Sequence, residues 1–299
     1  TKRIVVETPK QENSTAYGVQ LPSERLKGKD SFVLTWKTAL AEIAIPSDML
    51  PGEITGSGQA AIRVAEGSPE SLDAATREKI GNRPVLELSL FVDGKATAWS
   101  NPSAPVAISI PYKPTAEELR GPDSIVVWYI DGDGKATPVP NGRYDAATGT
   151  VVFRATHFSS YAVAFVSKTF GDLANAHWAK PAIEALAARD VIRGTSASAF
   201  APSASITRKD FVALLVRSLE LQNADFAGTG DGDGNGAAQP NASFTREDMM
   251  VLTASAWKAS GKPLEAGGAL DGFADAASLS ADAKASAAAL VKAGILNGK

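Results

Sequence analysis

The chain has 299 residues and a net charge of −3, with 44% hydrophobic and 21% charged residues, a composition typical of a globular protein long enough for two domains. It contains no cysteine, which excludes disulfides, thiolate metal sites and a cysteine nucleophile. It also lacks a run of basic residues to follow a nucleic-acid backbone and the roughly 18 consecutive apolar residues of a membrane helix, so we expect no nucleic-acid partner and no membrane insertion.

Residues 1–166 have the pattern of an all-β domain. Short runs rich in Val, Ile and aromatic residues alternate with clusters of Gly, Pro, Asn and Asp, a spacing typical of a sandwich or a partly open barrel. An Asp-Gly repeat at 131–134 predicts a hairpin turn, and a short helical turn is expected at Thr115–Leu119. The predicted strands are Arg3–Glu7, Ser31–Trp36, Ala61–Ala65, Val85–Val92, Val106–Ile110, Ser124–Ile130, Thr150–Arg154 and Ser160–Val166.

Residues 167–299 have the pattern of a helical domain, which makes the predicted fold class α+β, a β sandwich or barrel followed by helices. Alanine becomes frequent and the apolar residues take a helical period. Two further helices are expected over 245–260 and 280–293. The residues predicted to share one helix face are Trp178, Ala182, Ala185 and Leu186 in the first helix, and Phe211, Leu214, Leu215 and Leu219 in the second.

Three short segments of the helical region recur later in the same order, which indicates an internal repeat. The matching pairs are Phe170–Leu173 with Phe273–Ala276, Val191–Gly194 with Ile295–Gly298, and Ile206–Asp210 with Phe244–Asp248.

These segments resemble the S-layer homology family, most closely over residues 169–221. The resemblance implies helix–loop–helix repeats, with one complete repeat at 169–222, the latter half of a second at 240–261 and the first half of a third at 271–299. It also implies an extracellular protein of the bacterial cell wall or S-layer, bound to cell-wall polysaccharide through pyruvylated amino sugars. The ligand-binding positions that it implies are Asp172, Trp178, Thr207, Arg208, Thr245, Arg246 and Asp275.

The two Thr-Arg sites combine a structural feature with a chemical one. Thr followed three residues later by Asp predicts a helix N-cap with a capping box. The arginine beside each threonine opposes the helix dipole, which favours anions at that end, so an anionic ligand would explain it. A carboxylate could receive a bidentate guanidinium contact there. The alternative is a structural salt bridge.

The other implied positions also have structural alternatives. Trp178 could be a core anchor or could stack on a sugar face. Asp172 and Asp275 could accept bonds from sugar hydroxyls or could cap a turn. Asp190 stands where the family usually has glycine.

A second hypothesis concerns the end of the β region, where residues 156–160 read Thr-His-Phe-Ser-Ser. This resembles the cleavage step of self-cleaving β domains of the GAIN type. The resemblance implies an N-to-O acyl shift, in which the Ser159 hydroxyl attacks the Phe158 carbonyl and His157 acts as general base. The alternative is that His157 and Ser159 only satisfy a turn before the last strand.

The sequence therefore predicts an anchoring module that is no enzyme, self-cleavage aside, and that needs no cofactor or metal. Residues 231–236 match the start of a calcium loop, but Ala242 stands where the loop needs Glu, which favours a flexible acidic connection.

The chain begins with Thr1 and shows no signal peptide, so we expect an upstream domain of the same protein. The β domain would serve as its spacer.

Overall fold

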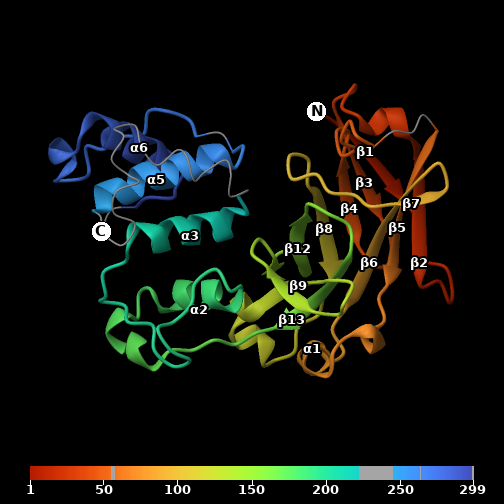
Figure 1. Cartoon of the computed structure of the whole chain (residues 1–299), viewed down its shortest axis with the longest axis horizontal. Helices are drawn as coiled ribbons and strands as arrows, with labels where there is room; N and C mark the ends of the chain where they lie inside the picture. The colour runs from red at the N-terminus through yellow and green to blue at the C-terminus, as the bar shows by residue number, and fades with distance from the viewer. Residues whose placement is uncertain (55–57, 222–244, 263, 298–299) are drawn as a thin grey trace. The chain divides into compact units, whose positions relative to one another are not determined.

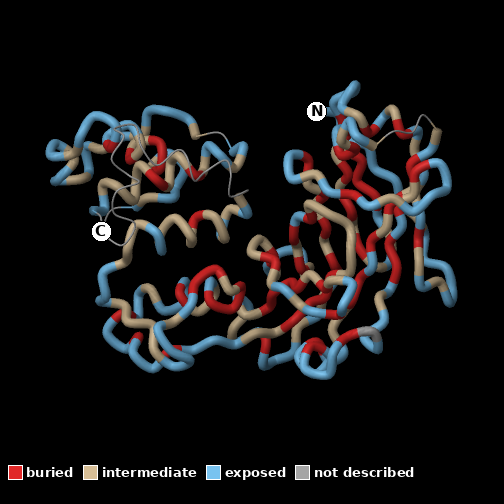
Figure 2. The backbone as a smooth tube through the Cα atoms, in the orientation of Figure 1, coloured by how far each residue is buried: buried red, intermediate tan, exposed pale blue. Residues whose placement is uncertain are grey.

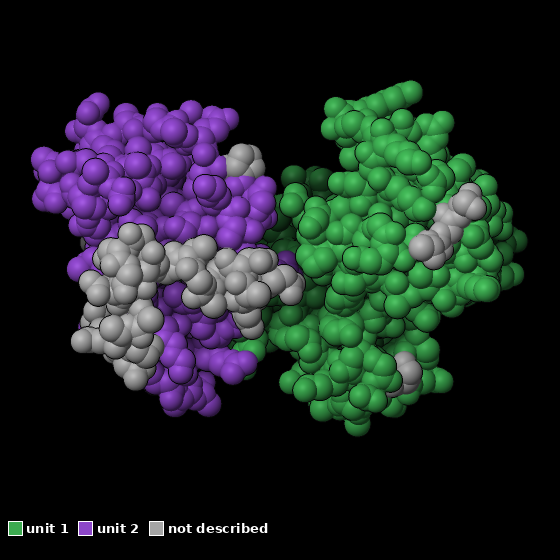
Figure 3. Space-filling view, turned by 45° about the horizontal axis from the view of Figure 1, so that its top comes forward, with its two compact units in different colours: residues 1–169, 178–190 green, residues 170–177, 191–299 purple. Residues whose placement is uncertain are grey.

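The computed structural model describes residues 1–54, 58–221, 245–262 and 264–297. They form two compact units: Thr1–Thr169 with Trp178–Asp190, and Phe170–His177 with Val191–Lys299 (Figure 3). The predicted α+β class is confirmed, while the domain boundary after residue 166 stays a prediction. Among the described residues no helix has the length and apolar character to cross a membrane.

The first unit is built on two β-sheets (Figure 1). The six-stranded sheet has the order β1 (Lys2–Glu7), β3 (Phe32–Lys37), β4 (Glu42–Pro46), β8 (Val106–Pro111), β12 (Thr150–Ala155) and β11 (Arg143–Asp145). The seven-stranded sheet has the order β10 (Ala136–Val139), β9 (Ile125–Ile130), β13 (Ser160–Phe165), β6 (Val85–Val92), β5 (Gln59–Glu66) and β2 (Ala16–Pro22), and β7 (Lys95–Thr97) also pairs with β6. Among the described strands only β1 and β3 pair in parallel.

All eight predicted strands are confirmed. Alternation between the core and the opposite face is clear in β8 and β12, whereas β1 is exposed throughout and β9 is buried along most of its length. In β3 the side chains of Phe32, Leu34 and Trp36 are buried in the main hydrophobic core. Buried residues gather along the strands of the two sheets (Figure 2). The hairpin turn is also confirmed, since the Asp131 carboxylate accepts N–H bonds from Asp133 and Lys135. The strands absent from the predicted ranges carry Gly, Pro or charged residues in short runs, and they are β2, β4, β7, β10 and β11.

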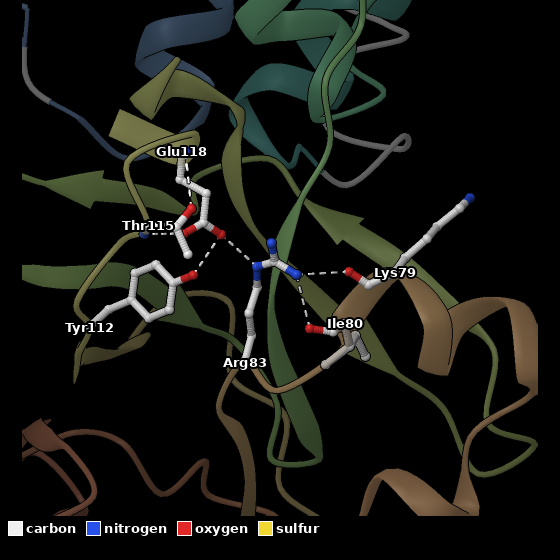
Figure 4. A network of polar contacts seen from close by, with 6 residues as sticks. All are labelled: Lys79, Ile80, Arg83, Tyr112, Thr115 and Glu118. Atoms are coloured by element: carbon white, nitrogen blue, oxygen red, sulfur yellow. Dashed lines mark hydrogen bonds and ion pairs between the residues drawn. The ribbon is translucent and has the colours of Figure 1, made fainter. Parts of the chain in front are cut away.

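A buried ion pair fixes the loop that follows β8 (Figure 4). The Glu118 side chain is only 2% exposed, and its Oε1 accepts from Arg83 Nε and from the Tyr112 hydroxyl, each at 2.7 Å. Its Oε2 accepts from the Thr115 N–H at 2.7 Å. Burial raises the pKa of Glu118, but these hydrogen bonds and the Arg83 charge together hold it below its ordinary value. Burial and the nearby Glu118 raise the pKa of Tyr112 to about 12.

The same loop carries a helix from the later part of the chain. Helix α2 (Lys180–Ala188) contacts the short 3₁₀ turn Pro122–Ser124, and Ala188 joins a second apolar cluster with Ile80 of α1 (Ala74–Ile80) and Trp128. Arg189, directly after α2, donates to the carbonyls of Gly142 and Asp123 at 2.9 and 2.8 Å. Helix α2 is therefore bound into the β unit.

The predicted apolar face of the first helix is wrong. Trp178 is 78% exposed and Leu186 is 38% exposed, whereas Ile183, Ala187 and Ala188 are buried. Trp178 lies before the helix begins at Lys180, so it does not follow the helical period. Two of these three buried residues are alanines, whose small side chains allow α2 to approach the β unit closely.

The second unit contains the other predicted helices. They are α3 (Arg208–Leu219), α5 (Arg246–Ala259) and α6 (Ala281–Lys292), with 3₁₀ turns at Gly171–Ala176 and Ala276–Ser278. Leu215 of α3 and Leu252 and Ala256 of α5 form a small core, which Phe211 and Leu219 border. Of the predicted apolar face of the second helix, Phe211, Leu215 and Leu219 thus meet this core, while Leu214 is half-buried.

Replacing Glu118 with glutamine tests the ion pair. At pH 7 we expect Glu118→Gln to lower the free energy of unfolding by about 3 kcal/mol, because it leaves the Arg83 charge without its partner. The carboxylate pKa is lowered by folding, so its contribution is present at neutral pH and is lost as pH falls through the folded-state pKa. The difference between the two proteins should therefore shrink in acid.

Urea unfolding at neutral and acid pH measures this effect. Glu117→Gln is the matched control, because Glu117 is the exposed neighbour of Glu118 and its loss should change little. A Glu118→Gln protein as stable as the wild type at pH 7 would show that the pair does not hold the loop.

Candidate functional site

The two Thr-Arg sites begin α3 and α5 in the same way. Thr207 Oγ1 accepts from the Asp210 N–H at 3.1 Å, and Thr245 Oγ1 accepts from the Asp248 N–H at 3.2 Å. At the second site the Asp248 carboxylate also accepts from the Thr245 N–H at 2.8 Å, which completes a capping box. The predicted N-caps are confirmed, and both hydroxyls are engaged within the protein.

The arginines occupy the first position of each helix. Arg208 is half-buried and Arg246 is exposed. The first turns also contain Asp210, Glu247 and Asp248, whose charges suit the positive end of the helix dipole, whereas the guanidinium groups oppose it. The N-cap bonds themselves are made by the threonines and the aspartates, and not by the arginines. The ligand-binding role of both arginines stays a prediction.

Asp172 has a structural role. Its carboxylate accepts from the Phe200 N–H at 2.9 Å and from the Ala201 N–H at 2.7 Å. These bonds lower the pKa of Asp172 and hold a turn in which Ala201 has a φ of 61°. Asp172 thus fixes the loop that leads to Thr207. Its contacts are those expected if it caps a turn.

Gly194 shows why that loop needs its own sequence. A Cβ at this position would lie 2.7 Å from the Ser196 carbonyl oxygen and closer still to the Ala199 carbonyl oxygen and the Phe170 ring. Phe170 in turn packs against Phe200 with ring centroids 5.6 Å apart. The motif residues Phe170, Asp172, Gly194 and Phe200 therefore build one loop in front of α3.

Three other predicted positions differ in their surroundings. Trp178 is largely exposed, so the core-anchor alternative is wrong. Asp275 is exposed and precedes the turn Ala276–Ser278 without capping it through its side chain, so it does not reproduce the contacts of Asp172. Asp190 adopts a φ of 53°, the left-handed conformation for which glycine is suited.

His157 and Ser159 do not form a nucleophile–base pair. The Ser159 hydroxyl donates to the Ile130 carbonyl at 3.1 Å, while His157 Nδ1 lies 3.2 Å from the Tyr161 hydroxyl. Tyr161 also donates to the His157 carbonyl at 2.8 Å, which ties the turn to β13. Burial lowers the pKa of His157. These contacts are those expected if His157 and Ser159 only satisfy a turn before the last strand. Self-cleavage stays a prediction.

Two interactions had no signal in the sequence. The Glu247 carboxylate of α5 accepts from the N–H of Ser280, the N-cap of α6, at 2.9 Å. Hydrogen bonds from the side chain and the backbone of Ser280 lower the pKa of Glu247. Arg217 of α3 donates to the Val191 carbonyl at 2.8 Å. Both link elements that are distant in sequence, so no local pattern reveals them. The suggested calcium segment, 231–236, lies outside the described residues.

Residues 169–212 match the S-layer homology domain family. The chain is 31% identical over 204 residues to an amylopullulanase of Thermoanaerobacterium thermosulfurigenes, covering 61% of this chain and 11% of that protein. It is 31% identical over 155 residues to exoglucanase XynX of Acetivibrio thermocellus, covering 44% and 14%. The endo-1,4-beta-xylanase A of Thermoanaerobacterium saccharolyticum is 34% identical over 103 residues, covering 27% and 9%.

The chain thus spans about a tenth of the length of these relatives. No solved structure matches it significantly. The predicted S-layer homology segment is confirmed, and with it the coarse assignment of a cell-wall anchoring module.

Replacing Gly194 with alanine tests the loop in front of α3. We expect Gly194→Ala to destabilise the protein by about 2 kcal/mol, because the added methyl overlaps backbone oxygen atoms that cannot easily move. Gly171→Ala is the control, since a Cβ at Gly171 would meet its nearest neighbour at 3.8 Å. Thermal unfolding measures both variants, and equal melting temperatures would contradict the proposed crowding.

Denaturing electrophoresis tests self-cleavage. Because Ser159 is bonded to Ile130 rather than to His157, we expect purified protein to run as one full-length band after prolonged incubation. Ser159→Ala should run identically. Two fragments from the wild type and one band from the variant would instead support cleavage between Phe158 and Ser159.

Proposed function

We propose that the chain anchors an exported bacterial protein noncovalently to the secondary polysaccharide of the cell wall. The observation that carries this proposal is the arginine at the first position of both α3 and α5, within a chain that matches the S-layer homology domain. The ligand groups that we propose are the carboxylates of pyruvylated amino sugars.

The chemistry of a helix start suits such a carboxylate. The first N–H groups of a helix have no intrahelical partner and point out of its end, where the dipole favours negative charge. A guanidinium at the same end adds two parallel N–H donors that match the two oxygens of a carboxylate. Arg208 and Arg246 would therefore supply the specific contact, while Thr207 and Thr245 keep the helix starts in shape.

Trp178 would supply a second kind of contact. An indole that is 78% exposed has a free face on which a sugar ring can stack. A large apolar side chain in this state costs hydration free energy, which binding of a sugar would recover. We assign no ligand contact to Asp172, because its carboxylate is engaged with Phe200 and Ala201.

The β unit would hold the cargo away from the wall and has no catalytic role in this proposal. The relatives bear the names of enzymes, and each is far longer than the matched part. A protein of that kind, working outside the cell at the wall, is the cargo that we propose.

Binding to purified cell-wall sacculi tests the assignment. We expect Arg208→Ala and Arg246→Ala each to reduce retention on sacculi by about tenfold, the loss of one charge-assisted contact. The double variant should bind no better than the wild type binds to sacculi stripped of their polysaccharide. Thermal unfolding of each variant verifies that the fold is intact.

Lys209→Ala is the matched control, because Lys209 is an exposed cation in the same first turn of α3. Its loss should leave retention almost unchanged. Equal losses of retention in the Lys209→Ala and Arg208→Ala proteins would show that binding depends on net charge and not on a specific arginine contact. Full retention of the double variant would exclude the arginines from the site.

A further inference from the structure

Within the described part of the chain, strand β1 has an edge that pairs with no other strand and presents a defined set of hydrogen-bonding groups. It is the outermost strand of the six-stranded sheet and pairs with β3 on one side. Lys2 and Thr8 donate their N–H groups toward β3, to the carbonyls of Ser31 and Lys37. Because these directions alternate along a strand, the backbone groups of Arg3, Val5 and Glu7 point to the open edge.

The side chains of β1 leave apolar surface in water. Val5 is 57% exposed, and Ile4 and Val6 are 36% and 39% exposed. Ile4 and Val6 border a groove of about 690 Å³, which Val19 and Leu21 of β2 and Phe32 and Leu34 of β3 also line. The groove thus lies between β1 and β2, the end strands of the two sheets. An exposed edge strand with apolar side chains favours the addition of another strand.

The charges of β1 indicate which strand fits. The sequence of the strand is Lys-Arg-Ile-Val-Val-Glu, with cations at its start and an anion at its end. The Glu7 carboxylate is exposed and has no ion pair among the described residues. A strand that runs antiparallel to β1 and brings a cation to Glu7 and an anion to Arg3 would match both ends. Strand β1 itself has that pattern.

We propose that two copies of this chain pair through β1, antiparallel and centred on Val5. In this register Val5 faces the partner's Val5, and Arg3 faces the partner's Glu7. Each of these is a pair whose backbone groups point to the shared edge, so they can exchange N–H···O bonds. On the groove side Ile4 faces the partner's Val6. A two-fold axis makes every contact occur twice.

Other antiparallel registers fit less well. A shift by one residue turns inward-facing backbone groups toward the partner and cannot form the ladder. A shift that centres the pair on Ile4 places Val5 against the partner's Arg3 and Lys2 against the partner's Val6. The register centred on Val5 alone combines apolar pairs with opposite charges. Such cross-strand pairs stabilise a sheet, whereas like charges directly opposite destabilise it.

Sedimentation velocity of the full chain over a range of concentrations tests the pairing. We expect a monomer–dimer equilibrium that Glu7→Arg weakens by at least about tenfold, because two arginines then face each other twice. Arg3→Glu should weaken it similarly. The double variant Arg3→Glu/Glu7→Arg should restore dimers, since it reverses both charges of each pair. Val5→Lys should abolish them.

Arg143→Glu is the matched control, because Arg143 is an exposed arginine on β11, the opposite edge strand of the same sheet. It should leave the equilibrium unchanged. A chain that stays monomeric at every concentration would overturn the pairing of two copies and would leave this edge to a strand of another protein. A dimer insensitive to Val5→Lys, or a double variant that stays monomeric, would overturn it as well.

Discussion

The architecture of the first unit depends on the hydrogen bonds that the guanidinium of Arg189 donates. The guanidinium is almost buried, and it donates to the Gly142, Asp123 and Ala185 carbonyls at 2.9, 2.8 and 2.7 Å. Burial lowers the pKa of Arg189, yet an arginine remains charged at any physiological pH. A buried charge is tolerated only when its hydrogen bonds are made, and its place after the last turn of α2 also suits the helix dipole. The charge therefore binds α2 firmly to the β strands.

The carbonyls that receive this charge are themselves held in place. Gly142 packs against Val127 so closely that a Cβ would lie 2.7 Å from the Val127 Cβ, and only glycine brings its carbonyl to Arg189. Asp123 lies in the loop that Glu118 fixes through Arg83 and Tyr112. The buried Glu118 thus supports the surface to which the buried Arg189 is bound. Helix α2 lies within the segment that matches the S-layer homology domain, so one part of that segment, Trp178–Asp190, belongs to the same compact unit as the β sheets.

Local patterns in the sequence predicted most of this fold, and the failures have a common cause. Strands with clear alternation, such as β3, and helix starts with Thr and Asp, such as that of α3, are set by neighbours in the chain. Arg189 reads as one more exposed cation, because nothing near it in sequence indicates Gly142 or Asp123. Trp178 reads as a core residue because the pattern counts apolar character, and only the start of α2 at Lys180 places it outside the helix. The shorter strands form because they pair with the sheets that they border, and a local pattern does not predict them.

The repeated motifs keep their local geometry to different degrees. Asp172 binds the backbone of Phe200 and Ala201, and the side chain of Asp275 makes no cap bond to the turn Ala276–Ser278. The Thr-Arg sites differ less, since Thr207 and Thr245 both cap a helix and both precede an arginine. The Thr-Arg motif keeps its geometry after two different segments of sequence, so the preceding segment alone does not constrain it. The N-cap bonds use the threonine and the acid, while a guanidinium at a helix start suits a carboxylate, so the arginine is the residue through which we expect a ligand to act.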